Sequence, residues 1–162
     1  MSLGKSVLLG EKQGEQRKIG RMKMPEKIEG RLFAVCGMNC MVCYSHLKTK
    51  KYGKACRGCL FDDESKPQHC RKCSIMNCCR SKGYSRCHEC AEFPCKILKR
   101  LEKAYQTKYG VSLLEQSRKV QESGIDAFME AEKERWICKQ CGGVISLHDS
   151  FCSDCLKTTY GI

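Results

Sequence analysis

The most specific chemical pattern in the sequence is a pair of cysteine knuckles near its end. Ten residues separate the first C-x2-C knuckle, which two glycines follow, from the second. Such a knuckle bends the backbone so that two thiolates converge on one metal ion, and a following glycine relieves the tight turn. Two knuckles joined by a short hairpin complete a closed, structural four-thiolate site. We predict a zinc ribbon with the ligands Cys138, Cys141, Cys152 and Cys155.

A second array of cysteines lies between residues 36 and 95. The predicted metal ligands in this array are Cys36, Cys40, Cys43, Cys56, Cys59, Cys70, Cys73, Cys78, Cys87, Cys90 and Cys95. One partition pairs two knuckles ten residues apart, as in the ribbon: Cys56, Cys59, Cys70 and Cys73. A second site would use Cys78, Cys87, Cys90 and Cys95. Interleaved pairings satisfy the same spacings, so the sequence leaves the partition open.

The first triplet, Cys36-x3-Cys40-x2-Cys43, needs a fourth ligand for a tetrahedral zinc site. His46, Cys79 or a distant residue could supply it. Three thiolates at this spacing can also hold a cubane iron–sulfur cluster with one open iron, as in radical S-adenosylmethionine enzymes. Those enzymes place the motif in a large barrel, and this chain has neither the length nor the strand–helix alternation of one.

The remaining candidates are weaker ligands. Cys79 directly follows Cys78, and adjacent side chains point apart in ordinary backbone, so we leave Cys79 out of the ligand set. His69 and His88 adjoin ligand cysteines, and we expect them near the metals or exposed to solvent. His148 is expected at the tip of the ribbon as a turn residue.

Cysteine content and the N-terminal residues indicate the cellular compartment. Sixteen of 162 residues are cysteine, a content typical of secreted disulfide scaffolds or of metal-binding proteins. Residues 1–31 are rich in lysine and glycine and lack the apolar stretch of a signal peptide. No segment approaches the roughly 20 apolar residues of a membrane span. We therefore expect a cytoplasmic protein without a membrane anchor, whose thiols are free to bind metal.

The formal net charge of +12 suggests a nucleic-acid partner, because basic patches neutralise phosphates. This value counts cysteines as neutral, whereas metal ligands are thiolates. Four four-thiolate zinc sites would lower the net charge to about +4. Much of the basicity then compensates metal–thiolate charge, which weakens the inference that the chain contacts nucleic acid.

Composition divides the chain into four regions. We predict a flexible basic leader over 1–31, a cysteine-rich multi-metal domain over 32–95, a helical segment over 96–136 and a zinc ribbon over 137–162. The second region has few large aliphatic residues. Structural zinc, at roughly 10–16 kcal/mol of apparent binding free energy per site, is the expected source of its order.

Turn and capping residues define three helices in the helical segment. An apolar stripe from Ile97 ends at Gly110, Ser112 opens a second helix that Gly124 closes, and Asp126 is expected to cap a third. A strand is expected over residues 144–147 of the ribbon. The predicted fold class is therefore a small metal-stabilised α+β protein with a cysteine-knuckle N-terminal domain, a helical segment and a C-terminal zinc-ribbon hairpin.

Several motifs in fixed order carry a family resemblance: Ala34-Val35-Cys36-Gly37-Met38-Asn39-Cys40-Met41-Val42-Cys43, Cys56-Arg57-Gly58-Cys59 and Cys87-His88-Glu89-Cys90-Ala91-Glu92-Phe93-Pro94-Cys95. Over residues 32 to 155 the chain resembles the cysteine-rich proteins grouped as domain of unknown function 3795, which are common in anaerobic bacteria and archaea. The resemblance implies small size and metal binding but no established reaction. Cys79 departs from the usual family pattern.

These features favour a multi-site zinc protein that binds three or four ions. We expect a non-catalytic interaction module with a protein partner of unknown identity and, as a weaker expectation, contact with nucleic acid. The alternative is an iron–sulfur protein for electron transfer or redox sensing, built on Cys36, Cys40 and Cys43. An enzyme is the least favoured class, because the four histidines are dispersed and no phosphate-binding glycine loop occurs.

Overall fold

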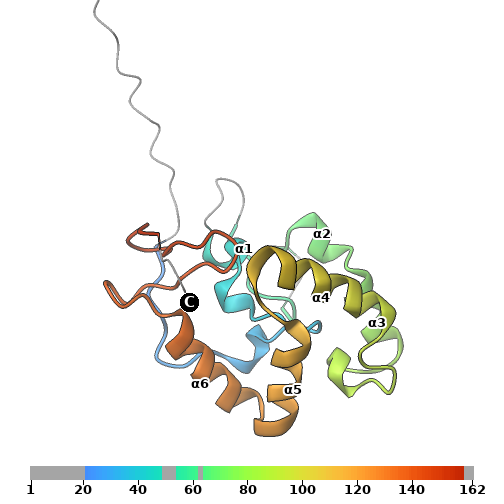
Figure 1. The fold of residues 1–162 in the computed structure, drawn as a ribbon. Helices are drawn as coiled ribbons and strands as arrows, with labels where there is room; N and C mark the ends of the chain where they lie inside the picture. The colour runs from blue at the N-terminus through green and yellow to red at the C-terminus, as the bar shows by residue number, and fades with distance from the viewer. Residues whose placement is uncertain (1–20, 49–53, 62–63, 159–162) are drawn as a thin grey trace, which may run out of the picture.

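The computed structural model describes residues 21–48, 54–61 and 64–158, and its ordered elements are mostly helical (Figure 1). Three short 3-10 turns are present in these residues: η1 (Gly30–Leu32), η2 (Cys40–Val42) and η3 (Cys87–Glu89). The α-helices of the cysteine-rich region are α1 (Tyr44–Leu47), α2 (Gln68–Arg71) and α3 (Ser74–Ser81). They are followed by α4 (Lys96–Tyr109), α5 (Leu113–Ser123) and α6 (Ile125–Trp136).

The three longer helices confirm the helical segment predicted from the sequence. Helix α4 ends at Gly110, whose φ of +64° is the left-handed conformation that glycine adopts most readily. The hydroxyl of Ser112 accepts a hydrogen bond from the Glu115 N–H at 3.0 Å, so Ser112 is the N-cap of α5 as expected. None of the described helices has the length and apolar character needed to cross a membrane.

The start of α6 differs from the prediction. We expected Asp126 to cap this helix, but the N-cap is Gly124, at φ +84°. The Phe128 N–H donates to the Gly124 carbonyl at 3.1 Å, so the helix begins immediately after the glycine turn. Asp126 therefore lies in the first turn of α6, where its negative charge interacts favourably with the positive end of the helix dipole.

Two buried carboxylates hold the elements together. Glu102 of α4 accepts hydrogen bonds from the Ser112 hydroxyl at 2.6 Å and from the N–H groups of Leu113 at 2.7 Å and Leu114 at 3.1 Å, so it caps the start of α5. Glu132 of α6 accepts from the Asn39 amide at 3.1 Å and the Trp136 indole at 2.9 Å. Each carboxylate accepts hydrogen bonds from N–H or O–H groups that burial would otherwise leave without an acceptor.

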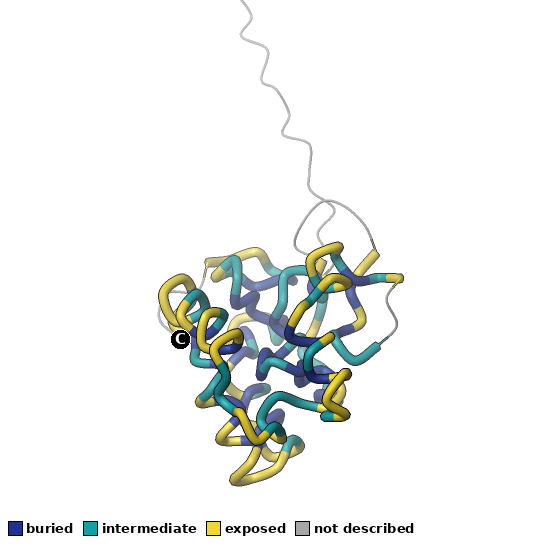
Figure 2. Tube along the Cα trace, turned by 90° about the vertical axis from the view of Figure 1, so that its right-hand side faces the viewer, coloured by how far each residue is buried: buried dark blue, intermediate teal, exposed yellow. Residues whose placement is uncertain are grey.

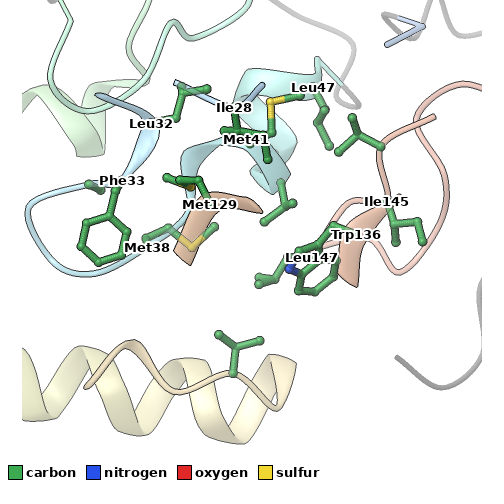
Figure 3. Close-up of a cluster of buried hydrophobic side chains, with 14 of the residues drawn as sticks. Ile28, Leu32, Phe33, Met38, Met41, Leu47, Met129, Trp136, Ile145 and Leu147 are labelled. Atoms are coloured by element: carbon green, nitrogen blue, oxygen red, sulfur yellow. The ribbon is translucent and has the colours of Figure 1, made fainter. Parts of the chain in front are cut away.

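The hydrophobic core draws on segments that are distant in the sequence. Figure 3 shows Phe33, Leu47, Met129, Trp136 and Leu147 in one cluster, contributed by the first cysteine-rich turns, α6 and the ribbon. Buried residues occur in all these segments. Figure 2 shows the buried positions toward the inside of the described chain and many exposed positions on its outer turns. The cysteine-rich region thus shares an apolar core with the rest of the described chain. The sequence did not predict this shared core, because the region itself contains few aliphatic residues.

The described end of the predicted leader pairs with residues 137–158, the described part of the predicted ribbon, which is called the ribbon below. The Met24 N–H donates to the Gly142 carbonyl at 2.9 Å, and the Val144 N–H donates to the Met22 carbonyl at 3.1 Å. Lys23 and Gly143 form the antiparallel bridge between these bonds. The rest of the leader, residues 1–20, lies outside the described residues.

The β component of the predicted α+β fold is smaller than expected. Among the described residues, β pairing consists of isolated antiparallel bridges, and the strand expected over 144–147 is wrong as a continuous element. Val144 bridges Ile137, whereas the next residue, Ile145, bridges Cys152. Val144 and Ile145 thus pair with different segments, and neither pairing extends beyond a single bridge.

The contacts of Glu102 give a stability prediction. Replacing Glu102 by alanine removes the acceptor of two backbone N–H groups and one hydroxyl, so we expect the free energy of unfolding to fall by about 2 kcal/mol. Chemical denaturation of the metal-loaded protein measures this. Glu122→Ala, an exposed change in α5, is the matched control and should change stability by less than about 0.5 kcal/mol. Equal effects of the two changes would contradict the capping role.

Candidate metal centre

Backbone hydrogen bonds and two glycines shape the first ribbon knuckle. The Cys138 N–H donates to the Gly143 carbonyl, and the Gly142 N–H donates to the Cys138 carbonyl, both at 2.8 Å. Gly142 has a φ of +73°, which disfavours other residues. A Cβ atom at Gly143 would lie 2.6 Å from the Cys152 sulfur. Both glycines are therefore needed for the second knuckle to approach the first.

The four ribbon thiols form a compact group of metal-binding geometry. The Sγ atoms of Cys138 and Cys155 are 3.9 Å apart, and those of Cys141 and Cys152 are 3.5 Å apart. All four ligand atoms lie within 4.8 Å of one another. A tetrahedral ion with metal–sulfur bonds of about 2.3 Å has sulfur–sulfur edges of roughly 3.8 Å. The predicted quartet therefore has the spacing that such an ion requires.

Local hydrogen bonds favour the thiolate of Cys138, whereas burial opposes ionisation of Cys141 and Cys152. Burial opposes ionisation of Cys138, but hydrogen bonds to the backbone of Gln140 and Cys141 outweigh it and lower the pKa of Cys138 to about 7. Burial raises the pKa of Cys152 to about 12. The metal-free site therefore retains protons near neutral pH, and a metal ion must displace them. Metal binding should accordingly weaken as the pH falls.

The segment that precedes the cysteine-rich region supports the ribbon from outside. Lys23 donates a hydrogen bond to the Cys141 carbonyl at 2.5 Å and forms an ion pair with Asp154 at 2.5 Å. The Asp154 N–H in turn donates to the Cys152 sulfur at 3.4 Å. One lysine thus links both knuckles, a role that the sequence did not reveal because Lys23 is more than 100 residues from its partners.

Seven thiols of the N-terminal array gather in a second region: Cys36, Cys40, Cys43, Cys56, Cys59, Cys70 and Cys73. Their charges act on one another; for example, after burial, the charges of Cys43, Cys56, Cys59 and Cys73 raise the pKa of Cys70 to about 12. The seven thiols are more widely spaced than those of the ribbon. Among the described residues, three or more candidate ligand atoms lie within 4.8 Å of one another in the ribbon but not in the seven-thiol region.

The other five cysteines line one cleft between α3, η3 and the start of α4: Cys78, Cys79, Cys87, Cys90 and Cys95. The cleft thus brings together the four cysteines of the second predicted site, Cys78, Cys87, Cys90 and Cys95. It also adds Cys79, which is 4% exposed, packs against Ile75 and Leu98, and donates its thiol hydrogen to the Tyr84 carbonyl at 3.2 Å. These contacts give Cys79 a packing role that needs no metal.

The histidines take part in hydrogen bonding and packing. His46 Nδ1 lies 2.7 Å from the Cys56 carbonyl oxygen. His148 lies among the rings of Tyr44, Tyr105 and Tyr109, and its Nε2 is 3.2 Å from the Tyr105 hydroxyl. His148 therefore joins the ribbon to α4, which is more than the turn role expected of it. His69 and His88 are likewise outside the compact thiol group.

Comparison with known proteins identifies the cysteine-rich part. Residues 32–100 match the family described as "Protein of unknown function (DUF3795)". This part of the chain is therefore similar to the DUF3795 family. The match confirms the resemblance over residues 32–100, which include the seven-thiol region, the five-thiol cleft and the first turn of α4. No curated protein and no solved structure matches the chain.

The crowding at Gly143 gives a prediction for the ribbon. In Gly143→Ala the new methyl group would collide with the Cys152 sulfur, so we expect metal affinity at this site to fall by about tenfold or more. Competition with a chelator measures this. Lys139→Ala changes an exposed side chain of the same knuckle and should retain the affinity of the unaltered protein. Unchanged affinity in both variants would contradict the proposed role of the glycine.

Proposed function

We propose that this protein is a multi-site zinc-binding protein that acts as a non-catalytic interaction module. The observation that carries the proposal is the convergence of Cys138, Cys141, Cys152 and Cys155 within 4.8 Å. Four thiolates fill every position of a tetrahedral ion, so this site has no room for a substrate and serves to stabilise the fold. The seven-thiol region and the five-thiol cleft would hold the remaining ions, for a total of three or four.

The ligand type and geometry support zinc. Soft thiolate donors in a tetrahedral set suit zinc or iron, and they disfavour magnesium and calcium, which prefer oxygen. Zinc has no redox chemistry, which fits a structural role for the ribbon. The iron–sulfur alternative at Cys36, Cys40 and Cys43 would instead supply electron transfer, and it is distinguished from zinc by the metal content.

A protein partner is the interaction that we favour. Zinc-bound knuckles would hold the surface of a small chain in one conformation, which lowers the entropy cost of binding a partner. The support for nucleic acid is the net charge alone, and most of the formal +12 is offset once the thiolates ionise around their ions.

Elemental analysis after purification without oxygen tests the proposal. We expect a colourless protein with three or four zinc ions per chain. Cys141→Ser should remove one of these ions, because it removes a ribbon ligand while the other regions keep all theirs. Cys79→Ala, which alters a buried cysteine outside the proposed ligand set, should keep every ion. A brown, iron-containing protein would overturn the zinc proposal in favour of the iron–sulfur alternative, and a protein without metal would overturn both.

A further inference from the structure

One face of helix α4 carries a row of positive charges. Four cationic residues of this helix lie at positions i, i+3, i+4 and i+7, and we call them the α4 stripe: Lys96, Lys99, Arg100 and Lys103. This spacing places side chains on one side of a helix, and all four residues are exposed. The row extends over about 10 Å of the helix axis. The buried residues of α4, Leu98 and Glu102, lie outside it.

No carboxylate of the described residues pairs with the α4 stripe. The acidic residue of α4 itself, Glu102, is buried and accepts its hydrogen bonds from the start of α5. Helices α5 and α6 differ, because Lys119 pairs with Glu115 at 2.9 Å and Lys133 pairs with Glu130 at 3.3 Å. The charges of the α4 stripe are therefore available to an anion from outside the described chain.

The α4 stripe also lies apart from the neighbouring thiols. Helix α4 contributes Ile97 and Leu98 to the lining of the five-thiol cleft, and none of the four cations of the stripe lines it. The cation that lines this cleft, among the described residues, is Lys82. Close neutralisation of thiolates in the cleft therefore does not occupy the stripe.

The α4 stripe is unfavourable for the helix that carries it. Its members are like charges at i, i+3 and i, i+4, which repel one another on a helix surface. Lys96 is the first residue of α4, and the first turn contains no acidic residue. Cations at this end also face the positive end of the helix dipole. A bound anionic partner would relieve both effects.

An exposed apolar side chain borders the α4 stripe. Ile97 is 47% exposed, and it lies three residues before Arg100, so the two side chains are neighbours on the helix surface. A phosphate backbone makes no use of such an apolar neighbour, whereas a protein segment can cover it. Tyr105 and Tyr109 of α4, which could stack on bases, instead pack against His148. The surface therefore suits a protein better than a nucleic acid.

We propose that the α4 stripe and Ile97 form a docking surface for an acidic protein segment that also presents an apolar side chain. Carboxylates of the segment pair with the four cations, and its apolar side chain covers Ile97 beside the cleft. This inference rests on the proposed function and deepens it, because it states the chemistry of the protein partner. Since salt screens exposed charges, binding should weaken as the ionic strength rises.

A synthetic peptide is the probe of this surface. It is a fluorescently labelled helical peptide with four glutamates at i, i+3, i+4 and i+7 and with leucines beside them, and fluorescence anisotropy follows its binding to the metal-loaded full chain at low salt. Lys99→Glu should weaken binding by about tenfold or more, because it replaces attraction by repulsion. Ile97→Ser should weaken it by about fivefold. Lys108→Glu reverses an exposed charge of α4 outside the stripe, and this matched control should change affinity by less than about twofold.

Thermal unfolding separates loss of the surface from loss of the fold. Lys99→Glu removes like-charge repulsion, so its melting temperature should equal or exceed that of the unaltered protein. Lys103→Glu is a second reversal within the stripe with the same expected loss of peptide binding. No binding by the unaltered protein, or equal losses in Lys99→Glu and Lys108→Glu, would overturn the docking surface.

A nucleic-acid probe and the metal content distinguish the remaining outcomes. A single-stranded oligonucleotide of the same charge should bind more weakly than the peptide. Tighter binding of the oligonucleotide, unaffected by Ile97→Ser, would overturn the protein partner in favour of nucleic acid. Failure of peptide binding with three or four zinc ions per chain would refute only the docking surface, whereas a protein without metal would refute the proposed function itself.

Discussion

The dominant physical constraint on this molecule is the burial of many neighbouring thiols, because burial and, after it, the charges of nearby thiols oppose their ionisation. Burial, with added repulsion from neighbouring thiols, raises the pKa of Cys36, Cys70 and Cys87. The same effect extends to Tyr105, whose pKa is raised by burial and then by the charges of three cysteines. Thiols in this setting either stay protonated or ionise together with a cation that neutralises them. Metal ions are the cations that we propose for this role.

The rest of the fold holds the cysteine knuckles at positions where cations could neutralise their thiolates. Glu132 of α6 bonds Asn39, whose own side chain accepts a hydrogen bond from Met41 at 3.0 Å at the start of η2. Asn39 therefore caps the turn that lies between Cys40 and Cys43. On the other side, His148 and Tyr105 join the ribbon to α4. The apolar core and these few buried polar bonds place the knuckles, and metal binding would then fix their thiols.

The sequence predicted the features that local spacing determines. The ribbon quartet followed from its knuckle spacing, and the helix boundaries followed from Gly110 and Ser112. The interleaving of the N-terminal cysteines was not predictable, because a knuckle pattern says which thiols are neighbours along the chain but not which knuckles meet in space. Long-range contacts such as that of Lys23 with Asp154, and the burial of Lys66, likewise leave no local signal. The prediction of a continuous strand over residues 144–147 was wrong, since Val144 and Ile145 each form a single bridge to a different segment.

X-ray absorption at the zinc edge is the measurement that tests metal stabilisation of the thiolates most directly, since it reports the type, distance and average number of ligand atoms around the zinc ions. The account predicts, for protein purified without oxygen, an average of four sulfur neighbours per zinc at about 2.3 Å and no nitrogen or oxygen in the first shell. A first shell containing nitrogen or oxygen, or a sample with no zinc edge and all thiols protonated, would contradict it.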